Sequence, residues 1–128
     1  MKHLHKFSFI AALIIFLFAG CGGSSGPDDV VNDFFRSIES GDTDKAAGMM
    51  SSQLVSMMGK EKLATALEEQ TKEMKEKGGI SDIKITDKEE KEESVTMNVT
   101  ITYGDGSTKS EKTKLVLEDG EWKIGIAK

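Results

Sequence analysis

Hydrophobic residues follow three different patterns along the 128-residue chain. An unbroken apolar run covers residues 7–20, helix-like spacing covers residues 27–77, and apolar and polar residues alternate over residues 83–126. The first run is typical of an export signal and short for a membrane-spanning helix. The other two periods are those of amphipathic helices and of half-buried strands. The chain is therefore predicted to have an export segment followed by helices and then by strands.

The helical region divides into three predicted helices, over residues 27–40, 42–59 and 60–77. Pro27 suits the first position of a helix, because its missing N–H would have no partner there. Glycines follow each helix and favour its end. The first helix has a single apolar stripe, which comprises Val30, Val31, Phe34, Phe35 and Ile38.

The alternating region predicts four strands, within residues 83–85, 95–103, 113–117 and 122–126. Asp105-Gly106 and Asp119-Gly120 separate the last three strands and favour tight hairpin turns. We expect the acidic run from Asp87 to Glu93 to form a solvated hairpin tip between the first two strands. Short connections and alternation predict an α+β domain, in which three helices cover one face of a four-stranded antiparallel meander and the other face stays wet.

The N-terminus resembles the signal of a bacterial lipoprotein. A basic MKHLHK segment precedes the apolar run, which ends in LFAGC, with small Ala19 and Gly20 directly before Cys21. Phe18 stands where the usual lipobox has an aliphatic residue. The resemblance implies cleavage between Gly20 and Cys21, a diacylglyceryl group on the Cys21 sulfur and often a third acyl chain on its amine, an anchor stronger than a single acyl chain provides.

This interpretation divides the chain into a signal peptide over residues 1–20, a lipidated cysteine with a flexible tether over residues 21–27 and one domain over residues 28–128. The six residues GGSSGP reach only about 13 Å, so the domain would lie close to the membrane. Gly22 is not Asp, and the lipoprotein sorting rule then favours the outer membrane in a host with two membranes. We expect an extracytoplasmic, membrane-anchored protein of the cell envelope.

The folded part resembles a known bacterial lipoprotein family. The run PDDVVNDFFRSIESGDTDKA, the alternating strands and the closing EDGEWKIGIAK are similar to the family called domain of unknown function 4878. That family belongs to the nuclear transport factor 2-like superfamily, which implies helices and a curved sheet arranged as a cone. The resemblance informs fold more than function, because this fold includes enzymes, ligand binders and interaction domains.

Composition excludes several kinds of partner and site. Without Lys2 and Lys6 of the signal, the mature chain has 15 basic and 22 acidic residues, a net charge of -7. We therefore expect no nucleic-acid partner, because such binding depends on clustered Lys and Arg. His3 and His5 are the only histidines and Cys21 is the only cysteine, so the mature domain has no disulfide and no Cys/His zinc site.

Two other groups of residues suggest metals but have simpler interpretations. The pairs Met49-Met50 and Met57-Met58 offer soft thioether ligands for Cu(I), yet their helical spacing is typical of core packing or of an adaptable contact surface. The acidic clusters lack the spacing of a calcium loop. We therefore predict no metal and no cofactor apart from the covalent lipid.

Eight residues are predicted to face the inside of the cone, where they could line a pocket or fill a core. A lined pocket would bind a small apolar ligand. The remaining enzymatic hypothesis is Tyr103 acting with a carboxylate, although no Asp falls at an inward strand position. We expect no catalytic residue and favour a non-catalytic module that binds an envelope protein or a small apolar ligand. The structural alternative is an envelope spacer or accessory subunit. The inward set comprises Phe34, Phe35, Met97, Val99, Ile101, Tyr103, Trp122 and Ile124.

Overall fold

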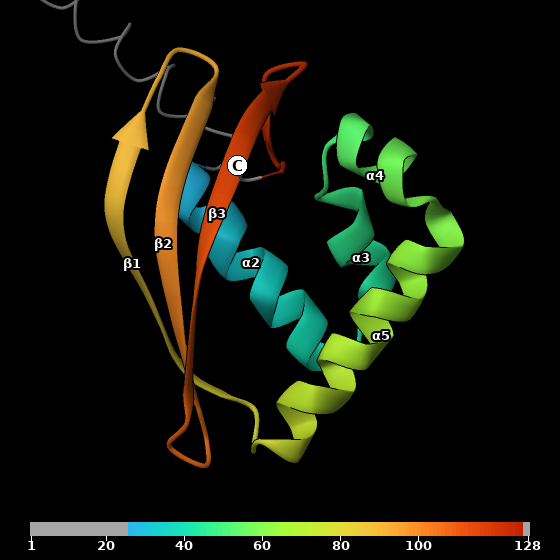
Figure 1. Ribbon diagram of the computed structural model, residues 1–128, viewed down its shortest axis with the longest axis vertical. Coiled ribbons are helices and arrows are strands. Elements are labelled where there is room, and N and C mark those ends of the chain that lie inside the picture. Colours follow the sequence, from blue (N-terminus) through green and yellow to red (C-terminus); the bar gives the residue numbers. More distant parts are fainter. Residues whose placement is uncertain (1–25, 127–128) are drawn as a thin grey trace, which may run out of the picture.

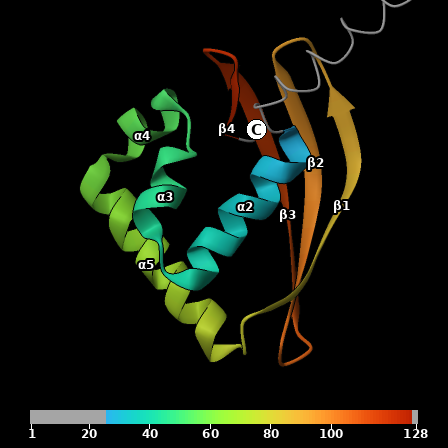
Figure 2. The same cartoon turned by 180° about the vertical axis from the view of Figure 1, so that it is seen from behind.

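The computed structural model describes residues 26–126, in which four helices are followed by four strands. The antiparallel sheet has the strand order β1-β2-β3-β4, and the helices lie on one side of it, with α2 running across the sheet (Figures 1 and 2). The predicted α+β class and the meander are confirmed. The helices are α2 (Pro27–Ser40), α3 (Thr43–Gly48), α4 (Ser52–Met58) and α5 (Lys60–Glu76); the strands are β1 (Ile80–Glu90), β2 (Ser94–Tyr103), β3 (Thr108–Glu118) and β4 (Glu121–Ile124).

Helix α2 begins and ends where local sequence predicts. Pro27 occupies its first turn together with Asp28 and Asp29, whose charges suit the positive end of the helix. Gly41 ends it in a left-handed conformation (φ 84°), and its N–H donates to the carbonyl of Ile38 at 3.1 Å. The whole predicted apolar stripe of this helix is buried in the hydrophobic core.

The prediction of one continuous helix over residues 42–59 is wrong, because two short helices, α3 and α4, occupy this range. The break falls at Met49–Ser51, where the chain pairs with β4. Ser51 N–H donates to the carbonyl of Ile124 at 2.8 Å, and Ile124 N–H donates to that of Met49 at 2.8 Å. These bonds satisfy backbone groups at the edge of the sheet that a continuous helix would leave unpaired. The described part therefore has four helices rather than the expected three.

Side-chain caps begin both short helices. The Asp42 carboxylate accepts from Lys45 N–H at 3.2 Å at the start of α3, and the Ser51 hydroxyl accepts from Leu54 N–H at 3.2 Å at the start of α4. A distant strand adds a second cap to α4, since the Glu118 carboxylate accepts from Ser52 N–H at 3.0 Å. Helix α4 has no fully buried residue, and Leu54, Val55 and Met58 pack partly buried against the core.

Helix α5 closes the domain against α2. Its buried residues are Leu63, Leu67, Thr71 and Met74. The Thr71 hydroxyl donates to the carbonyl of Ile38 at 2.7 Å and so joins the two helices. The following Gly78-Gly79 turn packs tightly on the β2–β3 hairpin, where a Cβ at Gly104 would collide with the Gly78 carbonyl oxygen.

The sheet has one dry face and one wet face. Alternate residues of β2, from Val95 to Tyr103, are buried, and their neighbours are half-buried. The hairpin turn at Asp119-Gly120 has positive φ at both residues (50° and 81°), as expected for Asp-Gly. Alternation along the third predicted strand places Leu117 on the inward face with Thr113 and Leu115, but it is 37% exposed near the end of β3.

The prediction that residues 87–93 form the hairpin tip is wrong for the first half of this segment, which belongs to β1. Strand β1 continues to Glu90, which pairs with Val95 after an irregularity between Thr86 and Glu89. Asp87 takes a left-handed conformation there (φ 51°), and Asn98 of β2 donates to its carboxylate at 2.8 Å. A bulge of this kind lets a charged edge strand stay paired, so the connection itself is only residues 91–93.

Candidate functional site

The eight residues predicted to face inward lie together in the molecule. Seven of them are at most 7% exposed and belong to one hydrophobic cluster; Trp122, which is half-buried, packs against it. The rings of Phe34 and Phe35 meet edge to face with centroids 5.2 Å apart. Three of the eight, Phe35, Ile101 and Tyr103, also line a small opening toward solvent.

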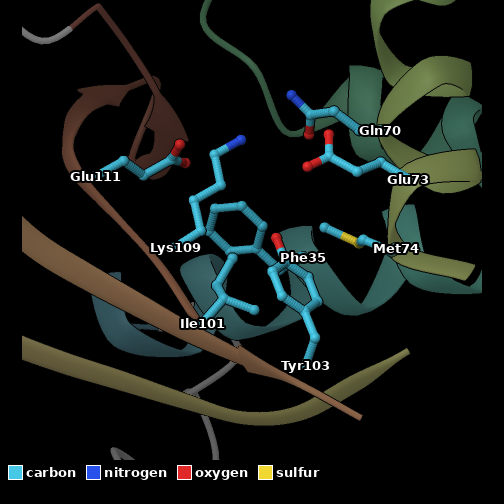
Figure 3. A pocket seen from close by; sticks show the side chains of 8 residues that line it. All are labelled: Phe35, Gln70, Glu73, Met74, Ile101, Tyr103, Lys109 and Glu111. Atoms are coloured by element: carbon cyan, nitrogen blue, oxygen red, sulfur yellow. The ribbon is translucent and has the colours of Figure 1, made fainter. Parts of the chain in front are cut away.

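This opening, here called the mouth cleft, lies between α5 and the β2–β3 hairpin (Figure 3). Gln70 and Glu73 of α5 stand across it from Lys109 and Glu111 of β3. Its volume is about 10 Å³, roughly the space that one water molecule needs. Its floor consists of Phe35, Met74, Ile101 and Tyr103.

Charged residues surround Tyr103 at the mouth cleft. Lys77 Nζ lies 4.9 Å from the centroid of the Tyr103 ring and 2.9 Å from Glu73 Oε1. The hydrogen bond from Lys77, together with the nearby charges of Lys77 and Lys109, lowers the pKa of Glu73. The same bond raises the pKa of Lys77. The Glu73–Lys77 pair therefore keeps both charges at neutral pH.

Burial raises the pKa of Tyr103, with Glu73 and Glu111 adding to the increase and Lys77 opposing it. A general base requires a shift in the opposite direction, toward neutral pH. Among the described residues, no hydrogen bond joins the Tyr103 hydroxyl to a carboxylate, and no buried side-chain polar atom lacks a partner. The hydroxyl therefore reaches solvent at the mouth cleft as a neutral phenol, which can donate or accept a hydrogen bond.

The four methionines of the two pairs lie in different environments. Met49, Met50 and Met58 pack against the core, whereas Met57 is 67% exposed. Across residues 26–126, no group of three or more His, Cys, Asp or Glu side chains lies close enough to hold a metal. The packing of three methionines agrees with the core interpretation, and Met57 contributes instead to the surface of α4.

Sequence reasoning missed a larger hollow, here called the helix groove, between α3, α4 and α5. It has a volume of about 390 Å³. The sequence signals for it are small residues, Ala47 and Gly48 in α3 and Ala64 in α5. The residues that line it are Thr43, Asp44, Ala47, Gly48, Val55, Lys60, Leu63 and Ala64.

Gly20 and Cys21, the predicted cleavage and lipidation residues, lie outside the described residues, as does most of the tether. None of the helices within residues 26–126 is long and apolar enough to cross a membrane.

Comparison with known proteins identifies the family and the fold. The family model described as "Domain of unknown function (DUF4878)" matches residues 19–125. A Campylobacter jejuni protein described as a candidate NTF2-like transpeptidase superimposes with a TM-score of 0.69 and 21% sequence identity, over 80% of this chain and 100% of that chain. A SEC-C motif-containing protein from Rhodopseudomonas palustris gives 0.57 and 12%, over 80% and 77%. These identities establish a shared fold and nothing finer, and no curated protein matches in sequence.

Proposed function

Because this chain belongs to the domain of unknown function 4878 family and has the fold of nuclear transport factor 2-like proteins, we propose that it is a lipid-anchored, non-catalytic interaction module of the cell envelope. The anchor is inferred from the order of basic segment, apolar run, small residues and Cys21. The interaction role is inferred from the interior of the domain.

The observation that supports surface binding is the filled interior. The side chains that would line a cone pocket form the hydrophobic core, and the mouth cleft above them holds only about 10 Å³. Small-molecule sites usually enclose roughly 300–1,000 Å³. A ligand inside the cone would have to displace packed side chains, whereas a partner at the surface would not.

The anchor is tested by substitution of Cys21. In the producing bacterium, Cys21→Ala is expected to abolish incorporation of labelled fatty acid, because it removes the sulfur that would carry the diacylglyceryl group. Ser24→Ala, three residues along the tether, is the matched control and should leave incorporation intact. Unchanged labelling of Cys21→Ala would refute lipidation at this residue.

The interior is tested separately on the mature chain carrying Cys21→Ser. Native mass spectrometry after purification without detergent is expected to show no bound molecule that a filled cone interior would remove. A stoichiometric lipid that is lost on Val99→Trp, which fills the centre of the sheet–helix interior, would favour the ligand-binding alternative. An unfolding curve of the variant distinguishes loss of the ligand from loss of the fold.

The second candidate is an enzyme that uses Tyr103. It is favoured by one observation, that this phenol opens into a cleft rimmed by Glu73, Lys109 and Glu111. Tyr103→Phe retains the ring that packs in the core and removes only the hydroxyl. Turnover detected with the intact chain should vanish in this variant if Tyr103 is catalytic, whereas an interaction module should show no turnover in either chain.

A further inference from the structure

The helix groove is lined by α3, α4 and α5, the three helices that lie on the side of the molecule opposite β1 (Figures 1 and 2). Its volume of about 390 Å³ falls within the range of roughly 300–1,000 Å³ that is typical of small-molecule sites. It shares no lining residue with the mouth cleft. The groove is therefore a separate candidate site with its own chemistry.

The floor of the groove is apolar. Leu63 is buried in the core, while Ala47 and Val55 are half-buried and pack against it. Ala64 continues the same apolar strip to the surface. Because Ala47 and Ala64 have short side chains, the space above the strip stays open. An apolar chain lying there would extend the core outward and lose contact with water.

The rim of the groove carries two charges in different situations. Lys60 is the first residue of α5, where the positive end of a 17-residue helix disfavours a cation. It forms no ion pair with any residue from 26 to 126. Asp44 lies in the first turn of α3, where a negative charge is favoured. The helix end is thus unfavourable for the charge of Lys60 and favourable for that of Asp44. An anion beside Lys60 would offset the unfavourable interaction.

One wall of the groove belongs to α4. Val55 lines the groove from this helix and is half-buried against the core, as are Leu54 and Met58. The start of α4 is held by the Ser51 hydroxyl and the Glu118 carboxylate. The helix has no fully buried residue, so its outer side chains can adjust to a ligand more readily than those of α2 or α5.

We infer that the helix groove binds a single-chain fatty acid, with the hydrocarbon chain over Val55, Leu63 and Ala64 and the carboxylate beside Lys60. The groove has an apolar floor and, at its rim, a single cation that forms no ion pair within residues 26–126; these match one hydrocarbon tail and one anionic head group. This site deepens the proposed interaction role by naming a ligand class. It is independent of the anchor, since it can be measured in a chain that lacks Cys21.

The probe is decanoate, added to the isotope-labelled mature chain with Cys21→Ser below the concentration at which decanoate aggregates. Amide NMR signals of residues 43–48, 55 and 60–64 are expected to shift in a saturable manner, with little change at Tyr103. Decanol, which has the same chain and no charge, is expected to bind more weakly. Shifts centred on Tyr103 and Ile101 would instead indicate binding inside the cone and would overturn the assignment to the groove.

Matched variants separate the charge from the apolar floor. Lys60→Gln should weaken decanoate binding by up to about fivefold and leave decanol unchanged, because the interaction lost is an exposed ion pair, which contributes modestly. Lys62→Gln is the control, since Lys62 also carries a charge in the first turn of α5 but does not line the groove. Asp44→Asn should tighten decanoate binding. Equal effects of the two lysine substitutions would contradict a head group beside Lys60.

The floor is tested by filling it. Ala64→Trp should abolish binding of both probes and Ala64→Leu should weaken it, whereas Thr65→Trp, at an exposed position outside the groove, should have no effect. The graded pair at Ala64 keeps the test valid if the larger side chain destabilises the helix. Full-strength binding to both Ala64 variants, or no saturable binding of decanoate to the parent chain, would overturn the inference.

Discussion

The sheet with α2 and the pair of short helices α3 and α4 differ sharply in how they are held. Every apolar residue of the α2 stripe is buried, and β2 buries every second residue along its length. Helix α4 has no fully buried residue, exposes Met57 and contributes Val55 to an open groove. Because burial of apolar surface is the main source of stability, we expect the first region to determine whether the domain folds. The second region is then free to provide surface for recognition.

The largest expected effect contrasts one buried and one exposed apolar residue from the two regions. Ile38→Ala, at a fully buried position of α2, should lower the free energy of unfolding by about 2–5 kcal/mol. Met57→Ala should change it by less than about 0.5 kcal/mol, since the side chain is 67% exposed. Urea denaturation of both variants measures the difference. Similar losses for the two variants would mean that α4 is as firmly packed as α2.

An intermediate effect is expected where a distant strand holds α4. Glu118→Ala removes the carboxylate that accepts from Ser52 N–H and from the Ser52 hydroxyl, and should cost about 0.5–2 kcal/mol, the range for loss of a helix cap. Hydrogen exchange should accelerate in α4 and remain unchanged in β2. Glu92→Ala, in the exposed connection between β1 and β2, is the control. Faster exchange throughout the sheet would show that the two regions are not independent.

The smallest expected effect is a pH dependence at the mouth cleft. The pKa of Glu73 is lowered in the folded state by Lys77, so its contribution is present above the unfolded pKa and is lost as the pH falls through the folded pKa. The pair is exposed, and its contribution is therefore small. Glu73→Gln should be slightly less stable than the parent at pH 7, and the difference should disappear in acid. Urea midpoints at several pH values measure it, and a difference that grows in acid would contradict this sign.

Much of the fold follows from features within a few residues of each other. Pro27 and Gly41 bound α2, the alternation from Val95 to Tyr103 marks the buried face of β2, and the Asp119-Gly120 turn forms as its dipeptide predicts. Helix periodicity also located α5. These features are local, because capping, turn conformation and side-chain period depend on neighbours along the chain.

The candidate sites were only partly predictable for the same reason. Period-two alternation located Ile101 and Tyr103 on the inner face, but not whether that face would enclose a space or fill it. The helix groove requires the break after Gly48, which no local signal predicted. Lys60 and Asp44 are 16 positions apart in the chain and face one hollow only because α3 and α5 pack together.

The sequence by itself determined the export-signal pattern, the helix and strand periods, the turns and the acidic character of this chain, since each depends on residue types at short spacing. Tertiary structure alone decided that Ile124 would break a helix at Met49–Ser51 and that Glu118 would cap α4. It also decided that the cone would be filled and the groove left open. Those outcomes depend on which backbone groups and side chains come into contact across the fold. The residues involved lie far apart along the chain, more than 60 positions in the cases of Ile124 and Glu118, so the local sequence pattern around each one does not predict the contact.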